Sequence, residues 1–130
     1  METLQTPTPP PVKLYLLGSG RNELQIDIMD LRSKRPLLQF YTYNYIAYLN
    51  ANDMQLLVKA VEAYMTHSTP LQFYTMDNYT TLLIKSMKRK RFVEIHMTAN
   101  GHRSCKFRTT SEVFAGLASQ IKTFLTSLNP

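Results

Sequence analysis

The chain has 130 residues and one cysteine, with 44% hydrophobic and 18% charged residues. That length suits one small domain, and the composition excludes an intrinsically disordered chain, a coiled coil and a collagen-like chain. Fifteen Lys and Arg residues against nine Asp and Glu residues give a net charge of +6, which favours a polyanionic partner.

Cys105 is the only cysteine, so an intrachain disulfide and a cysteine-based zinc site are both excluded. No stretch approaches the roughly 18 consecutive apolar residues of a membrane span, and the N-terminus lacks the basic-then-apolar order of a signal peptide. We therefore expect no membrane partner. The expected location is the cytoplasm, or the nucleus if the host is eukaryotic.

Residues 1–11 carry four prolines and no apolar pattern, which predicts a disordered tail before a fold that begins near Val12. Residues 13–17 form a candidate strand that ends at a Gly-Ser-Gly turn. Residues 24–28 (LQIDI) alternate with the period of two typical of a half-buried strand. A basic turn, residues 32–36 (RSKRP), follows this strand.

Residues 37–49 (LLQFYTYNYIAYL) predict one long strand. Alternation along that strand places three tyrosines on one face: Tyr41, Tyr43 and Tyr45. The opposite face would carry Leu38, Phe40, Thr42, Ile46 and Tyr48.

A helix follows, for which Asn52 is the predicted N-cap. Its apolar face is expected to carry Met54, Leu57, Val58, Val61 and Met65. Residues 67–70 (HSTP) end the helix.

The second half of the chain repeats this order. Residues 71–75, 79–87 and 92–98 predict strands, with a basic turn at residues 88–91 (KRKR). A three-residue loop at residues 99–101 would pair Ile95 with Cys105 in the next strand, and would set Glu94 opposite Lys106.

The last predicted element is a helix that starts from a capping box. Thr109 is its expected cap and Glu112 its third helical residue. The expected apolar face carries Phe114, Leu117, Ile121, Leu125 and Leu128.

The predicted fold class is α+β, with two tandem antiparallel β-sheet-plus-helix units, strands then one helix, twice. We expect the sub-repeats 12–67 and 70–128 to form one domain, residues 12–130. Each unit has about 60 residues, too few to bury a sufficient core alone. We therefore expect the units to pack together as one domain, or the chain to form a homodimer.

The positive charge is concentrated in one segment. Residues 85–108 hold eight Lys or Arg residues and one acid, a local net charge of +7, whereas the other 106 residues total −1. Such clustering is typical of phosphate contacts, and tyrosine rings give bases a surface for stacking. The candidate nucleic-acid-binding residues are Arg32, Lys34, Arg35, Tyr41, Tyr43, Tyr45, Tyr74, Tyr79, Lys85, Lys88, Arg89, Lys90, Arg91, His102, Lys106 and Arg108.

Each signal has a structural alternative. The run at residues 88–91 can be a solvated turn, and tyrosines that alternate along a strand often pack against a helix. A duplex-reading helix is not indicated, because the predicted helices contain Lys59 alone and Lys122 alone.

Catalytic and metal-binding patterns are weak. The three histidines lack metal-ligand spacing. Asp77 followed by Glu94 and His96 only faintly resembles a magnesium-nuclease core, in which a lysine would stand where His96 is. We expect no catalytic residues, no metal site and no cofactor.

Residues 24–28, a basic turn, the strand ending at residues 48–50 (YLN) and the helix after it resemble one known unit. It is the β-sheet-plus-helix unit of the single-stranded-DNA-binding transcriptional coactivator family (positive cofactor four) and of the related whirly fold. The family's I-x-L-N ending is similar to residues 46–50 (IAYLN), which have one residue extra. Residues 79–126 are similar in outline, with residues 107–109 (FRT) in place of that ending.

The resemblance implies a curved antiparallel sheet braced by helices, which binds single strands without sequence preference on its concave face, usually as a dimer. Purine-rich-element-binding repeats share a similar duplication of strands and helix. Family members usually carry one unit per chain, so a tandem pair here could replace the dimer.

The predicted function is non-enzymatic binding of single-stranded nucleic acid, with single-stranded DNA favoured over RNA. Phosphate contacts of the basic hairpin and stacking on tyrosine would supply the affinity. The alternative is a protein-interaction or scaffold domain, viral or of a mobile element, whose basic hairpin binds an acidic partner.

Overall fold

A computed structural model describes residues 12–17, 23–29, 35–43, 45–76, 80–87, 91–99 and 104–128, with the backbone alone at residues 12–17, 104 and 128. The elements follow in the order β1 (Val12–Leu17), β2 (Leu24–Met29), β3 (Leu37–Tyr41), β4 (Ile46–Leu49), α1 (Ala51–His67), β5 (Gln72–Met76), β6 (Thr80–Ser86), β7 (Phe92–Ala99), β8 (Ser104–Thr110) and α2 (Ser111–Leu128).

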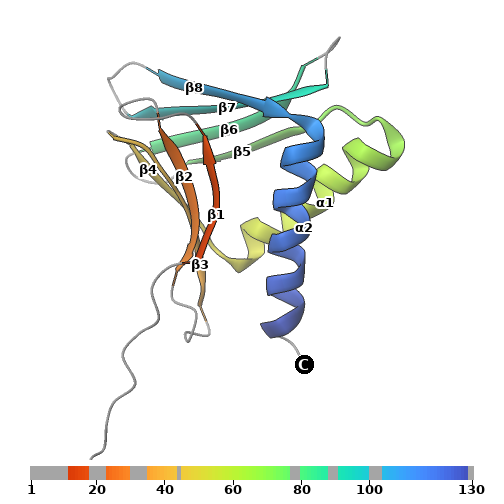
Figure 1. The fold of residues 1–130 in the computed structure, drawn as a ribbon, viewed down its shortest axis with the longest axis horizontal. Helices are drawn as coiled ribbons and strands as arrows, with labels where there is room; N and C mark the ends of the chain where they lie inside the picture. The colour runs from red at the N-terminus through yellow and green to blue at the C-terminus, as the bar shows by residue number, and fades with distance from the viewer. Residues whose placement is uncertain are drawn as a thin grey trace, which may run out of the picture.

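The strands form two antiparallel sheets, in the orders β1-β2-β3-β4 and β5-β6-β7-β8, and each sheet is followed by one helix. The sheets lie at a steep angle to one another, and both helices lie on the side where the sheets face each other (Figure 1). Each sheet therefore has an outer face that neither helix covers. The predicted α+β class, with strands then one helix twice, is confirmed.

The helices join the two units. α1 contacts β3 and β4 of its own unit and also β5, whereas α2 contacts β7 and β8 and also β1. The two helices also pack against each other. Both units therefore share one buried interior, as expected for units too small to bury a core alone.

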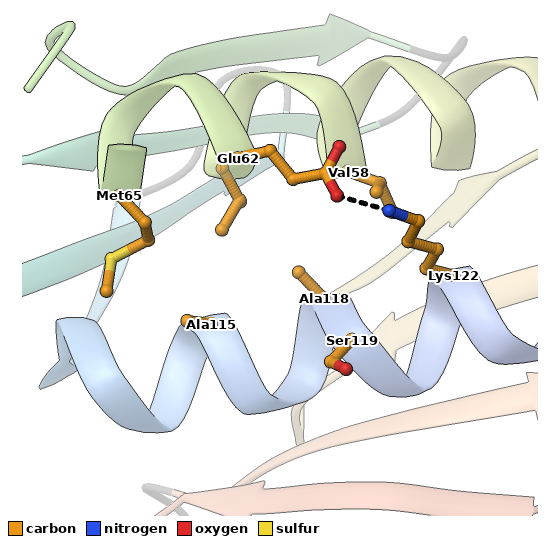
Figure 2. Close-up of a pocket in the computed structure, with 8 residues that line it drawn as sticks. Val58, Glu62, Met65, Ala115, Ala118, Ser119 and Lys122 are labelled. Carbon is orange, nitrogen blue, oxygen red and sulfur yellow. Dashed lines mark hydrogen bonds and ion pairs between the residues drawn. The ribbon is translucent and has the colours of Figure 1, made fainter. Parts of the chain in front are cut away.

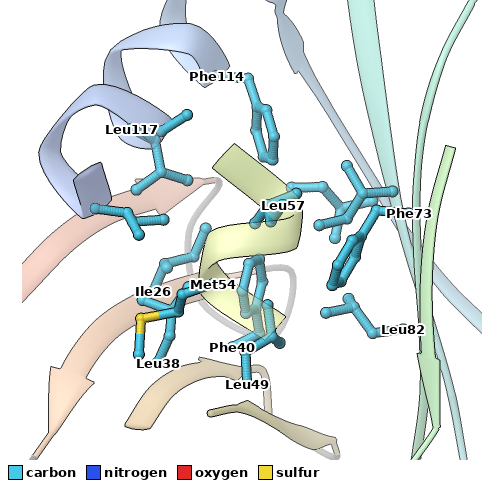
Figure 3. Close-up of a cluster of buried hydrophobic side chains, with 14 of the residues drawn as sticks. Ile26, Leu38, Phe40, Leu49, Met54, Leu57, Phe73, Leu82, Phe114 and Leu117 are labelled. Carbon is cyan, nitrogen blue, oxygen red and sulfur yellow. The ribbon is translucent and has the colours of Figure 1, made fainter. Parts of the chain in front are cut away.

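Figure 3 shows that interior, where side chains from both sheets and both helices converge. Phe40 and Phe114 are the largest of the almost fully buried side chains, and they come from different units. Burial of such a side chain contributes about 1.5–3 kcal/mol to folding. The labelled contributors are Ile26, Leu38, Phe40, Leu49, Met54, Leu57, Phe73, Leu82, Phe114 and Leu117.

The single strand predicted for residues 37–49 is wrong, because the chain reverses within it. β3 ends at Tyr41, and a short turn follows in which Thr42 N donates to Tyr45 O at 2.8 Å. Tyr45 N donates back to Thr42 Oγ1 at 3.1 Å. The turn contains neither glycine nor proline, which explains why the composition does not reveal it.

The reversal changes which side chains face the interior. Ala47 and Leu49 are buried, whereas Ile46 and Tyr48 are 42% and 43% exposed. The prediction that Ile46 and Tyr48 share a face with the buried Phe40 is therefore wrong. An alternation pattern cannot be carried through a hairpin turn.

Helix α1 is capped two residues earlier than predicted. Asn50, not Asn52, is the N-cap, and its side-chain oxygen accepts from Asp53 N at 2.8 Å. The helix ends where predicted, with Ser68 in the left-handed region at φ 57°. Met65, expected on the buried face, is 46% exposed.

Helix α2 is capped by Thr110, whose Oγ1 accepts from Val113 N at 3.1 Å. The predicted cap, Thr109, is instead a buried residue of β8. The capping box is therefore wrong, and the Glu112 carboxylate pairs with Arg91 at 3.0 Å. The buried positions of α2 include Phe114, as predicted.

The register of the β7–β8 hairpin differs from the prediction by two residues. Ile95 lies opposite Phe107, and Met97 lies opposite Cys105. A shift of two residues keeps every side chain on its predicted face. Hydrophobic alternation therefore cannot distinguish the two registers.

Candidate nucleic-acid interface

The outer face of the β5–β8 sheet carries four of the nine described candidate residues: Tyr74, Lys85, Lys106 and Arg108. Strand pairing aligns Tyr74, Leu83, His96 and Lys106 in one row across the four strands. The next row on the same face, two residues along each strand, contains Gln72, Lys85, Glu94 and Arg108. The intervening residues of each strand, such as Ile84 and Ile95, point to the interior and are fully buried. We call these two rows the basic face.

Three cations belong to the basic face. Lys106 and Arg108 are exposed on the edge strand β8, two residues apart and thus separated by about 7 Å along the strand. Lys85 is half-buried on β6, two strands away, at a spacing of about 10 Å. No acid in the described part of the chain forms an ion pair with Lys85 or Lys106.

Glu94 is the acid within this face, and its partner is not the predicted Lys106. Arg108 Nη2 lies 2.9 Å from one carboxylate oxygen, and His96 Nε2 lies 3.0 Å from the other. Glu94 is only 5% exposed. Hydrogen bonds from Arg108 and then from His96 lower the pKa of Glu94 from 4.5 to about 2. The carboxylate therefore stays ionised and neutralises part of the Arg108 charge.

Arg108 is held from a second side. Its guanidinium carbon lies 6.0 Å from the centroid of the Phe92 ring, within the range of a cation–π contact. The side chain is nevertheless 49% exposed. Arg108 is thus oriented by Phe92 and Glu94 while part of it faces solvent.

Arg91 fixes the end of the predicted basic turn to α2. Its backbone oxygen accepts from Ser111 N at 2.8 Å, and its side chain pairs with Glu112 at 3.0 Å. Both side chains of this ion pair are largely exposed, so the pair is weak. Arg91 therefore remains available as a cation near the basic face.

The predicted tyrosines divide between the two sheets. Tyr74 belongs to the basic face and is 60% exposed. Tyr41 lies in β3, and Tyr43 is 69% exposed in the β3–β4 turn, so both belong to the other sheet. Tyr45 packs partly buried against the core. The predicted ladder of three tyrosines on one strand face is therefore wrong, because the hairpin turn interrupts it.

The other candidates lie away from the face or outside the described residues. Arg35 is exposed, just before β3 in the first sheet. Those outside the described residues are Arg32, Lys34, Tyr79, Lys88, Arg89, Lys90 and His102.

Two residues that contact the charged groups of the basic face were missed as site residues in the sequence. Phe92 orients Arg108, and His96 hydrogen-bonds Glu94. The alternation of Glu94 and His96 with buried residues already indicated that they share the polar face. The contacts of Phe92 and Glu94 with Arg108 of β8 depend on the register, which the pattern leaves open.

A groove of about 230 Å³ lies between α1 and α2, on a different side of the molecule (Figure 2). Its lining is largely apolar, with Val58, Met65 and Ala118 among the residues. Glu62 and Lys122 cross it as an ion pair, Oε2 to Nζ at 2.6 Å, so their charges compensate. The groove therefore offers no uncompensated charge to a phosphate.

Groups that could support metal chemistry are not assembled in the described regions. There, no three His, Cys, Asp or Glu side chains converge as metal ligands. None of the helices described is long and apolar enough to cross a membrane.

Sequence comparison does not assign the chain to a family. No protein-family model matches it, and no characterised protein matches its sequence significantly. The geometry of the basic face is therefore the basis on which its function has to be judged.

Proposed function

We propose that the protein binds single-stranded nucleic acid on the basic face and catalyses no reaction. One observation carries this proposal: an exposed tyrosine, Tyr74, shares an open sheet face with Lys85, Lys106 and Arg108. Cations that contact phosphates together with aromatic rings that stack on bases are the usual means of holding a single strand.

The shape of the face favours a single strand over a duplex. A duplex is usually read by a helix in the major groove, and neither helix here presents a row of cations. The described lysines of the helices are Lys59 of α1 and Lys122 of α2, and Lys122 pairs with Glu62. The open sheet face leaves unstacked bases room to lie on Tyr74, which is 60% exposed.

The spacing across the sheet indicates an oligonucleotide rather than a mononucleotide. Tyr74 on β5 and Lys106 on β8 lie in one row, separated by three strand spacings or about 14 Å. One nucleotide does not bridge a stack on Tyr74 and a phosphate at Lys106. Contacts of this kind do not read base edges, so we propose little sequence specificity.

The type of nucleic acid, the location, the oligomeric state and the family of the protein are part of the same proposal. Single-stranded DNA is the favoured ligand and RNA the alternative, with action in the cytoplasm or nucleus as a monomer or homodimer. Membership of the group formed by the positive-cofactor-four, whirly and purine-rich-element-binding proteins is likewise proposed. The tandem strand-and-helix units support it as an architecture.

The test is a titration of a fluorescent single-stranded oligonucleotide with the double variant Lys85→Ala, Lys106→Ala. Loss of two phosphate contacts should flatten the salt slope by about 1.4 and weaken binding on the order of 25-fold at 0.1 M salt. Lys59→Ala is the matched control, because this exposed lysine lies on α1. Equal losses in both variants, or no binding by the wild type, would contradict the proposal.

Tyr74→Ala separates nucleic-acid binding from binding of an acidic protein. Loss of one stack should cost about 1–3 kcal/mol of binding free energy without changing the salt slope. Polyglutamate, which offers charge without bases, should bind more weakly than an oligonucleotide of equal charge. Equal affinities, together with an unchanged Tyr74→Ala variant, would favour the acidic-partner alternative.

A further inference from the structure

Arg108 is the cation of the basic face whose charge is already compensated. Its Nη2 lies 2.9 Å from Glu94 Oε2, and Glu94 is only 5% exposed. The pKa of Glu94 is lowered to about 2, chiefly by this hydrogen bond, so the carboxylate is negative at neutral pH. Lys85 and Lys106 form no ion pair with any described acid. A phosphate therefore gains more from either lysine than from Arg108.

The guanidinium group of Arg108 is also held in a fixed orientation. Its carbon lies over the Phe92 ring, 6.0 Å from the centroid, and one edge of the group is bonded to Glu94. Phe92 is two residues before Glu94 on β7, so both side chains belong to the same face of the sheet. The Arg108 side chain is nevertheless 49% exposed. Its exposed area lies on the side that neither Phe92 nor Glu94 covers, so an oriented flat group faces solvent.

A flat guanidinium group is a suitable surface for a nucleobase. Unstacked bases of a single strand stack on aromatic rings and on the planes of Arg guanidinium groups. Such stacking depends on the planar, weakly hydrated shape of the group, and a lysine ammonium does not provide it. Compensation of the Arg108 charge by Glu94 leaves this plane intact. The chemistry of Arg108 in this setting therefore suits a base better than a phosphate.

The distance to Tyr74 shows that the two surfaces serve different bases. Arg108 lies three strands away from Tyr74, about 14 Å, and one row further along, about 7 Å. The diagonal separation is thus about 16 Å. A strand with the rise of about 3.4 Å per nucleotide found in a duplex would span it in about five steps. A more extended strand would need fewer.

We propose that Arg108, supported by Phe92, is a second base-stacking surface of the basic face, so that one strand places one base on Tyr74 and another on Arg108. This inference rests on the proposed function, because it assigns the parts of the bound strand to individual residues. Lys85 and Lys106 contact phosphates, and Arg108 contacts a base. Phe92 is a positioning residue that acts through Arg108.

The test compares the wild type with Arg108→Lys on two oligonucleotides of equal length and charge, both long enough to span the two surfaces. One is oligodeoxythymidylate, and the other lacks every base. Because Arg108→Lys keeps the charge, the salt slope should not change on either strand. Loss of one stack should weaken binding of the base-containing strand at least about fivefold. Binding of the abasic strand should change less than about twofold.

Two further variants sharpen the comparison. Phe92→Leu keeps an apolar side chain but removes the ring beside Arg108, so it should weaken binding of the base-containing strand and spare the abasic strand. Arg91→Lys is the matched control, because Arg91 also pairs with a carboxylate but has a side chain that is 87% exposed. This control should bind both strands as the wild type does.

Each outcome decides the proposal. A loss confined to the base-containing strand supports it. Unchanged binding of that strand by Arg108→Lys overturns it, whereas salt-dependent binding by both proteins would leave the proposed function standing. Equal losses on the two strands also overturn it, because Arg108 then contacts a phosphate. Failure of the wild type to bind either strand contradicts the proposed function itself, and this inference with it.

Discussion

Replacement of Glu94 by Gln tests the electrostatics of the basic face. The substitution keeps the shape of the side chain and an oxygen that accepts from Arg108, but it removes the negative charge. In the folded chain the carboxyl pKa lies at about 2 instead of 4.5, chiefly because Arg108 and His96 hydrogen-bond to it. The ionised form of Glu94 therefore stabilises the fold.

The magnitude follows from the pKa shift. Each pKa unit corresponds to about 1.4 kcal/mol, so full retention of the shift would give about 3 kcal/mol at neutral pH. Because the Arg108 side chain is 49% exposed, solvent screening reduces the expected contribution to about 1–2 kcal/mol. A depressed pKa stabilises the fold above the unfolded value of 4.5, and this stabilisation is lost as the pH falls towards 2.

Urea denaturation of the wild type and Glu94→Gln between pH 7 and pH 2.5 measures this contribution. The free energy of unfolding should differ by about 1–2 kcal/mol at pH 7, and the difference should shrink steadily below pH 4.5. Glu112→Gln is the matched control, because its carboxylate is 55% exposed, and a change below about 0.5 kcal/mol is expected. Parallel pH profiles for wild type and Glu94→Gln would refute the reasoning.

The same variant should bind nucleic acid more tightly. Without the negative charge of Glu94, the charge of Arg108 is no longer compensated and can neutralise one more phosphate, which steepens the salt slope by about 0.7 and tightens binding about fivefold at 0.1 M salt. Weaker binding by a correctly folded Glu94→Gln protein would show that Glu94 positions Arg108 for the ligand rather than competing with it.

Three further predictions concern the fold. Phe40→Ala should reduce the free energy of unfolding by about 3–5 kcal/mol in urea titrations, because the ring is fully buried among both units. Asn50→Ala should cost about 1 kcal/mol and Asn52→Ala almost nothing, since only Asn50 caps α1; equal effects on thermal stability would contradict this cap. Tyr64→Phe should cost about 1 kcal/mol by the same assay, because its hydroxyl bonds Ser111 Oγ at 2.7 Å and so links α1 to α2.

Periodicity was sufficient to predict the fold class. Leu24, Ile26 and Ile28 alternate as a strand should, and Met54, Leu57 and Val61 recur at helical spacing; all six are buried as expected. These patterns reflect local geometry, which a short window of sequence contains.

Features that depend on two segments at once were not predictable in this way. The β7–β8 register differs by two residues because both registers keep the same faces, and contacts such as Glu94 with Arg108 distinguish them. The turn between Tyr41 and Ile46 has no glycine or proline, so the faces after it were assigned incorrectly.

The sequence predicted one part of the candidate site, the basic segment, but not which tyrosine lies beside it. Concentration of charge in residues 85–108 pointed to the sheet that carries the basic face without any knowledge of its pairing. Which tyrosine lies on the same face as the cations depends on the spatial order of the strands, and the sequence does not contain that order. The strand pairing places Tyr74 in one row with Lys106 across four strands.

The most direct test of the central claim is one salt-dependent titration on single-stranded DNA, single-stranded RNA and duplex DNA side by side. No described acid neutralises Lys85 or Lys106. We therefore expect the logarithm of the affinity for single strands to fall with the logarithm of the salt concentration with a slope of about −1.4 or steeper. Single strands should also bind more tightly than the duplex at every salt concentration. Equal or tighter binding of the duplex, or affinity for single strands that does not change with salt, would contradict the account.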